Sequence, residues 1–207
     1  MAYVFYRIDD LLREPSKGPP KPLTLYSLID NDRTDKNTVH SYLNVYTDLF
    51  CSRKNTAKNV LEVGIAGGGS IKLWHDYFTN ATVYGLDIRH SSKVWDELKT
   101  LSRVKLLTSI NAYDADTFPF SDKKFDIIID DGSHKMEDMI SFIKLYSECI
   151  AEGGILIIED IPSIYWIDVL KQMVPDALKP YIKVYNLIGT KNRFDDILFT
   201  IDLSRKV

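Results

Sequence analysis

The chain has 207 residues, of which 45% are hydrophobic, with 26 Lys and Arg against 29 Asp and Glu and a formal net charge of −3. This size and composition predict one globular domain with a substantial core and exclude a disordered chain. The slight acidic excess offers no basic patch, so we expect no nucleic-acid partner. The apolar runs are too short for a membrane span, and the first ten residues lack the pattern of a secretory signal, which together predict a cytoplasmic location.

Residues 1–33 are predicted to form an N-terminal arm that ends in a Pro-rich linker, because the prolines and glycine of residues 15–22 disfavour regular structure. Residues 34–207 are predicted to form the single folded domain. It begins with a helix over 35–53, where apolar residues recur at helical spacing.

Strands and helices alternate from residue 59 onward. The pattern consists of five strands, each followed by a further element, and a closing antiparallel pair. It predicts an α/β fold of the Rossmann-like kind. We expect a mostly parallel seven-stranded sheet with one antiparallel strand and helices on both faces. The predicted strands are 59–64, 82–87, 103–108, 125–130, 153–159, 181–188 and 195–202, and the predicted helices are 69–78, 92–101, 135–152 and 163–173.

A glycine-rich turn follows the first of these strands and predicts a cofactor site. The strand ends at Gly64 and passes through Gly67 into a helix, and Asp87 closes the next strand about 20 residues later. Glycines let backbone N–H groups approach a ligand, and an acid at the second position accepts bonds from ribose hydroxyls. Glu62, just before the turn, would repel a pyrophosphate, but its charge suits a cationic amino acid. The pattern therefore favours S-adenosylmethionine over a dinucleotide cofactor, which makes a dehydrogenase less favoured.

Acidic residues close two later apolar runs. Asp130 and Asp131, with His134 just beyond, follow the run 125–129, and Glu159 and Asp160 follow the run 154–158. Parallel strands deliver their carboxyl ends to one edge of a sheet, where unpaired acids at close range require a cation. Hard oxygen ligands favour Mg²⁺ or Mn²⁺. Two interpretations of these acids stay open: they bind a metal, or they accept hydrogen bonds from N–H groups at helix starts.

On these residues the chain resembles class I S-adenosylmethionine-dependent methyltransferases, and within them the metal-dependent sugar O-methyltransferases of macrolide biosynthesis, of the mycinamicin and macrocin type. The stretch Thr34-Asp35-Lys36, followed by His40, Tyr42 and Tyr46, resembles the segment that those enzymes place before the core domain. One departure is Ser109-Ile110-Asn111, where the family often has Gly-Asp-Gln.

The resemblance implies a role for each matching residue. It implies that Asp131, Glu159 and Asp160 bind the metal and that His134 is the general base, with Asp131 beside it in the catalytic site. The expected cofactor-binding residues are Glu62, Gly64, Ile65, Ala66, Gly67, Asp87, Ile88, Asn111 and Asp130. Two alternatives remain open for single residues, because His134 could instead cap the following helix and Asp130 could bond the backbone or the cofactor rather than the metal.

The expected activity is Mg²⁺-dependent transfer of a methyl group from S-adenosylmethionine to a sugar hydroxyl, in a deoxyhexose such as rhamnose. The acceptor would be a glycoside, a glycolipid or a polysaccharide end, and the chain could act as a homo-oligomer or as a domain of a larger glycan-synthesising enzyme. The alternatives are a catechol-type O-methyltransferase, which also chelates adjacent oxygens on Mg²⁺, and a non-catalytic module that binds S-adenosylmethionine without turnover.

Overall fold

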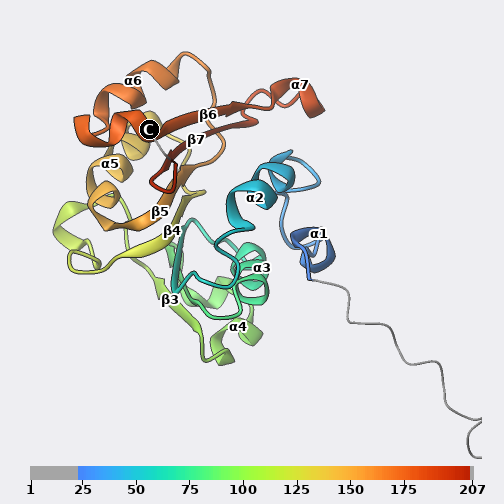
Figure 1. Cartoon of the computed structure of the whole chain (residues 1–207). Coiled ribbons are helices and arrows are strands. Elements are labelled where there is room, and N and C mark those ends of the chain that lie inside the picture. The colour runs from blue at the N-terminus through green and yellow to red at the C-terminus, as the bar shows by residue number, and fades with distance from the viewer. Residues whose placement is uncertain (1–22, 206–207) are drawn as a thin grey trace, which may run out of the picture.

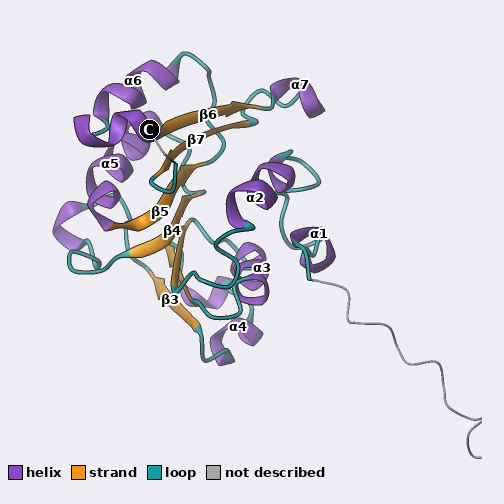
Figure 2. Cartoon of the chain, viewed as in Figure 1, coloured by secondary structure: helices purple, strands orange, loops and turns teal. Residues whose placement is uncertain are grey.

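The computed structural model describes residues 23–205. Seven strands form one sheet in the order β3-β2-β1-β4-β5-β7-β6, and helices cover both of its faces (Figures 1 and 2). The strands are β1 (Asn59–Val63), β2 (Thr82–Asp87), β3 (Val104–Thr108), β4 (Phe125–Asp130), β5 (Ile150–Ile158), β6 (Ile182–Asn186) and β7 (Ile197–Asp202). The α-helices are α1 (Leu25–Leu28), α2 (Tyr42–Phe50), α3 (Gly69–Tyr77), α4 (Asp96–Thr100), α5 (Met136–Tyr146), α6 (Trp166–Met173) and α7 (Ile188–Lys191). Short 3₁₀ turns lie at Ser91–Lys93, Ala115–Thr117, Ser147–Cys149 and Asp176–Tyr181.

The pairing of the strands confirms the predicted topology. β1 lies at the centre and pairs in parallel with β2 and β4, and the parallel order continues to β3 and β5. β7 runs antiparallel to both of its neighbours, β5 and β6, so it is the one reversed strand. The fold is therefore the predicted Rossmann-like one, a mostly parallel seven-stranded sheet with one antiparallel strand.

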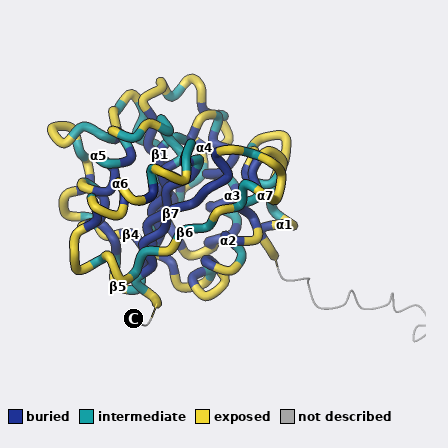
Figure 3. The backbone as a smooth tube through the Cα atoms, turned by 90° about the horizontal axis from the view of Figure 1, so that it is seen from above, coloured by how far each residue is buried: buried dark blue, intermediate teal, exposed yellow. Residues whose placement is uncertain are grey.

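Two apolar cores lie on opposite faces of the sheet, because successive residues of a strand point to opposite sides. Val60 and Ile127 face the core that contains α2 and α3, whereas Leu61 and Ile128 face the core that contains α5 and α6. The central strands β1, β4 and β7 are consequently buried on both faces, as the dark blue centre of Figure 3 shows, whereas the edge strands β3 and β6 are partly exposed. Continuous apolar runs in the sequence are the signature of such strands.

Several predicted element bounds differ from the structure. The helix predicted over 135–152 ends at Tyr146, and β5 begins at Ile150, which pairs with Phe125 ahead of a register shift. Gly153, with φ of +68°, was predicted to begin this strand and lies inside it instead. The helix predicted over 35–53 begins only at Tyr42, because Asp35 and Lys36 start hydrogen-bonded turns that direct side chains into the domain. The helix predicted over 92–101 is a 3₁₀ turn followed by the short α4.

Residues 23–33 lie against the domain. Leu25 of α1 is fully buried in the same core as α2 and α3. The rest of the predicted arm, residues 1–22, lies outside the described residues, and the boundary between 33 and 34 stays a prediction. Across residues 23–205 no helix combines the length and the apolar character that crossing a membrane requires.

Candidate active site

The candidate site lies where β1, β4 and β5 end at the same edge of the sheet. Val63 at the end of β1 is in register with Asp130 at the end of β4, and Asp130 is in register with Ile158 of β5. The residues that follow these three strands are therefore neighbours in space, although they lie far apart in the sequence. The register agrees with the prediction that both acidic pairs meet at one sheet edge, and it brings the glycine turn to the same edge.

A cavity of about 820 Å³ opens at this edge. Its lining combines residues of the glycine turn with acids and the histidine. The predicted site residues that line it are Gly64, Ile65, Ala66, Asp87, Ile88, Asn111, Asp131, His134 and Asp160. Among the described residues, four other predicted positions lie outside its lining: Glu62, Gly67, Asp130 and Glu159.

The glycine turn is held in shape by Asp87. One oxygen of Asp87 accepts hydrogen bonds from the backbone N–H groups of Ile65 and Ala66, both at 3.0 Å, and the other accepts from the N–H of Arg89 at 2.7 Å. Beside it Ile88 is 69% exposed and offers an apolar wall to the cavity. A carboxylate at the cavity rim with an apolar surface next to it suits a ribose and its attached base, so these residues fit an adenosine.

Gly64 is required by both its conformation and its surroundings. Its φ is +80°, and a Cβ at this position would lie 2.0 Å from the carbonyl oxygen of Asp131. We therefore expect Gly64→Ala to destabilise the protein by roughly 2–4 kcal/mol, since it combines a left-handed backbone with a backbone clash. Urea unfolding would measure this change, and Gly189→Ala, where a Cβ would meet open space, is the control. Equal effects of the two substitutions would contradict the packing argument.

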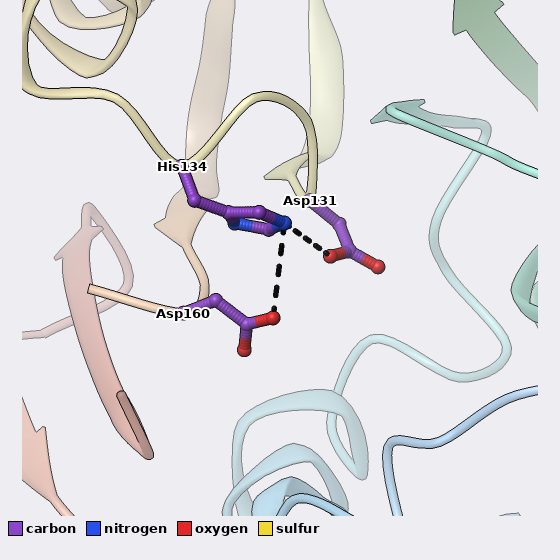
Figure 4. A group of neighbouring side chains, drawn as sticks. All are labelled: Asp131, His134 and Asp160. Atoms are coloured by element: carbon purple, nitrogen blue, oxygen red, sulfur yellow. Dashed lines mark ion pairs between the residues drawn. The ribbon is translucent and has the colours of Figure 1, made fainter. Parts of the chain in front are cut away.

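Asp131, His134 and Asp160 form the open side of the acidic site (Figure 4). Nε2 of His134 lies 3.9 Å from Oδ1 of Asp131 and 3.9 Å from Oδ2 of Asp160. His134 and Asp160 both adopt left-handed backbone conformations, with φ of +55° and +51°. Such conformations are uncommon outside glycine and concentrate at functional sites. The loops after β4 and β5 are thus bent so that these side chains converge on the cavity.

The oxygens of this open side fit a divalent cation. The ligand atoms of the three residues lie within 4.8 Å of one another, and Asp131 and Asp160 supply hard carboxylate oxygens. Such donors suit Mg²⁺ or Mn²⁺. Asp131 also belongs to a second group of this kind, with Glu62 and Glu159. The predicted ligands Asp131, Glu159 and Asp160 are therefore divided between two groups that share Asp131.

The second group lies inside the protein and surrounds the ammonium of Lys36. Nζ of Lys36 donates to Oδ2 of Asp131 and to Oε2 of Glu159, each at 2.7 Å. Tyr46 donates to the other oxygen of Glu159, and Tyr42 donates to Oδ1 of Asp160. As a result, the inner oxygens of all three acids are engaged, while Oδ1 of Asp131 and Oδ2 of Asp160 face His134.

Burial shifts the pKa values of the acidic cluster. Burial and the neighbouring Asp131 raise the pKa of Asp160 to about 7. Burial also raises the pKa of Glu159, although the Lys36 ammonium opposes this shift. For Lys36 itself burial acts to lower the pKa, but the charges of Asp131, Glu159 and Glu62 outweigh it and hold the pKa well above its usual value. Lys36 is therefore a permanent cation in this cluster.

The raised pKa of Asp160 predicts a pH dependence of cation binding. Below pH 7 the carboxyl of Asp160 in the metal-free protein is mostly protonated, and a cation must displace that proton. We expect Mn²⁺ affinity to rise about tenfold per pH unit up to pH 7 and to level off above it. Mn²⁺ titrations followed by electron paramagnetic resonance at a series of pH values would measure this. An affinity that does not change between pH 5.5 and pH 7 would contradict it.

Two predicted cofactor residues, Glu62 and Asp130, are enclosed by the protein. Glu62 accepts hydrogen bonds from Oγ of Ser70 at 2.6 Å and from Nε1 of Trp74 at 3.1 Å. Asp130 accepts from the hydroxyl of Tyr113 at 2.7 Å, and burial raises its pKa to about 7. Both carboxyls lie directly behind residues that line the cavity, and a role in cofactor binding for either of them remains a prediction.

Lys36, Tyr42 and Tyr46 were assigned no role from the sequence. One signal in the sequence could have pointed to them. The helix over 35–53 was predicted from its apolar residues, and the same stretch carries polar side chains at 36, 40, 42 and 46. His40 belongs to the same set, with Nδ1 at 3.2 Å from Oδ1 of Asp160 and a ring that stacks on Tyr42. Buried polar groups need partners, and for Lys36, Tyr42 and Tyr46 those partners are the acids of the site.

Residues 61–158 match the family described as "Methyltransferase domain". Over this central part the chain is similar to that family, and its seven-stranded sheet has the matching Rossmann-like order.

Its relatives include sugar O-methyltransferases. It is 30% identical over 142 residues to the 8-demethyl-8-alpha-L-rhamnosyl tetracenomycin-C 2'-O-methyltransferase of Streptomyces olivaceus, covering 64% of this chain and 36% of that protein. It is 33% identical to the mycinamicin VI 2''-O-methyltransferase of Micromonospora griseorubida, covering 62% of this chain and 33% of that protein. The chain therefore spans about a third of the length of the curated relatives it matches.

A solved structure with the same fold is the MycE methyltransferase from the mycinamycin biosynthetic pathway in complex with Mg, SAH and mycinamycin VI. The TM-score is 0.66 at 22% identity, over 88% of this chain and 55% of that one. At this level of identity the likeness establishes the fold.

Proposed function

We propose that the chain transfers a methyl group from S-adenosylmethionine to a sugar hydroxyl with the help of a divalent cation. The observation that carries this proposal is the single cavity that joins the turn at Gly64 and Asp87 to the open side formed by Asp131, His134 and Asp160. A methyl donor bound at the first place and a hydroxyl bound at the second would lie next to each other, which is the arrangement that direct transfer requires.

The relatives support a sugar as the acceptor. Two of them are named as O-methyltransferases of a rhamnosyl tetracenomycin and of mycinamicin VI, and the solved structure with this fold contains Mg and SAH. We extend the cofactor, the cation and the sugar class from those proteins to this chain. The cation is placed at Asp131 and Asp160, with Glu159 behind them, and a deoxyhexose such as rhamnose is the proposed acceptor.

The residues of the open side have complementary roles. When bound, the sulfonium of S-adenosylmethionine supplies an activated methyl group, and a divalent cation holds two adjacent hydroxyls and increases their acidity. Nε2 of His134 takes the proton of the reacting hydroxyl, whose oxygen forms the new bond to the methyl carbon as the carbon–sulfur bond breaks. The imidazole suits this task near neutral pH. Asp131 and Asp160 orient the acceptor from the two sides of His134.

An acceptor screen with radiolabelled S-adenosylmethionine tests the proposal. Rhamnosides and other deoxyhexosides would be compared with catechols, each with Mg²⁺ and with excess chelator, and cofactor binding would be measured separately by calorimetry. We expect labelled glycoside only when Mg²⁺ is present. Transfer to catechols alone would replace the sugar by an aromatic diol, whereas cofactor binding without transfer to any acceptor would favour a non-catalytic module.

A further inference from the structure

We propose that the ammonium of Lys36 is a built-in cation of the acidic site, which fills an inner carboxylate cage and positions Asp131 for a single exchangeable divalent ion on the cavity side. Lys36 would act as a positioning residue, since it does not line the cavity among the described residues. The exchangeable ion rests on the proposed function, whereas the inner cage stands on its own contacts.

The inner cage has the composition of a metal site. Its members are Glu62, Asp131 and Glu159, which can each place one oxygen within 4.8 Å of the others. Nζ of Lys36 occupies the position between them, at 2.7 Å from Asp131, 2.7 Å from Glu159 and 3.3 Å from Glu62. The side chains of Lys36, Glu62 and Glu159 are at most 1% exposed. Buried carboxylates at this density require a positive charge, and Lys36 provides it.

Asp131 connects the inner cage to the open side. Its Oδ2 accepts the hydrogen bond from Lys36, and its Oδ1 is the oxygen directed to His134. A carboxylate fixed at one oxygen by a buried ammonium presents the other in a defined direction. Oε1 of Glu62, by contrast, has no hydrogen-bond donor within the described part of the chain and lies 3.3 Å from Nζ of Lys36. If the ammonium were removed, this free oxygen and the other cage carboxylates could therefore bind a divalent cation.

Lys36→Met tests this inference, because methionine keeps the unbranched length of the side chain without its charge. The measurement is the number of Mn²⁺ ions bound per chain, determined by electron paramagnetic resonance at pH 8 without acceptor. We expect the variant to bind one more ion than the wild type, and its melting temperature to rise more with added Mn²⁺ than that of the wild type. An unchanged ion count in the folded variant would overturn the inference.

Two further variants serve as controls. Lys36→Met combined with Glu159→Gln removes one charge of each sign from the cage and should fold without gaining an ion. Lys191→Met loosens the same segment, because Nζ of Lys191 donates to the carbonyl oxygens of Asn37, Thr38 and His40, but it leaves the cage intact and should also gain none. An extra ion in Lys191→Met would overturn the inference, since a loosened segment alone would then create the site.

The remaining outcomes of these experiments also support or overturn the inference. If Lys36→Met stays unfolded at millimolar Mn²⁺ while the charge-balanced double variant folds, the cage accepts no divalent ion and the inference is wrong. If the wild type binds no Mn²⁺, the cation of the proposed function is wrong, yet one ion gained by Lys36→Met would still support the inner cage. The two failures are therefore distinguishable.

Discussion

His134→Asn is expected to lower kcat by roughly 10²–10⁴-fold, the usual contribution of a positioned general base. Asparagine tolerates the left-handed backbone at this position, where φ is +55°, so the fold should be retained. Its amide cannot accept the proton of the acceptor hydroxyl. Binding of S-adenosylmethionine and Mn²⁺ should change by no more than about threefold, because the base acts on the reaction and not on either ligand. Steady-state rates with the acceptor found in the screen, together with calorimetry, would measure both quantities.

The measurements separate the roles that His134 could have. A loss of Mn²⁺ affinity that parallels the loss of kcat would identify His134 as a cation ligand, which its position between Asp131 and Asp160 would permit. An unchanged kcat would leave only a structural role. His90→Gln is the matched control, because His90 is exposed and its hydrogen bonds go to Ser92.

Asp160→Asn is expected to weaken Mn²⁺ binding by at least about 100-fold and to remove most of the methyl transfer, since the loss of a single outer-shell partner already costs 10- to 100-fold. S-adenosylmethionine should bind as in the wild type, because its proposed contacts are with the glycine turn and Asp87 and not with the carboxyl of Asp160. The hydroxyl of Tyr42 can still donate to the amide oxygen, and asparagine suits the left-handed backbone at Asp160. The fold should therefore persist.

The same substitution should stabilise the metal-free protein at pH 8. The pKa of Asp160 is raised to about 7 in the folded state, above its ordinary value of about 3.9. The folded protein therefore binds this proton more tightly than the unfolded chain, and stability falls as the pH rises from about 4 through 7. A neutral amide removes that loss, a gain of up to about 4 kcal/mol at pH 8 for these two pKa values. Urea unfolding with chelator would measure it.

Asp168→Asn provides the control for both effects, because the Asp168 side chain is largely exposed and, within the described part of the chain, pairs with Lys171 on its own helix. It should change neither Mn²⁺ affinity nor stability. A loss of stability in Asp160→Asn without a loss of Mn²⁺ binding would show that Asp160 is a structural acid, and the cation would have to be placed elsewhere.

The sequence was sufficient for the sheet and for the edge where the site lies. Strands buried on both faces need mostly apolar runs, so β4 and β5 are visible as Phe125–Ile129 and Gly154–Ile158. The reversed β7 and the glycine turn after β1 were also predictable, because short connections and positive φ values impose local sequence requirements. The bounds of β5 were not, since Ile150 joins the strand through its pairing with Phe125 on another strand.

Which oxygens of the acids face the cavity was decided by the tertiary structure alone. Lys36 lies 95 residues before Asp131 and 123 residues before Glu159 in the sequence, and Tyr42 lies 118 residues before Asp160. Local patterns carry information about the turn or strand that a residue forms, but not about the distant side chain that packing brings against it. The sequence by itself therefore determined the fold, the acids and the histidine, whereas the packing of residues 36–46 across the sheet edge determined how those acids are paired and oriented.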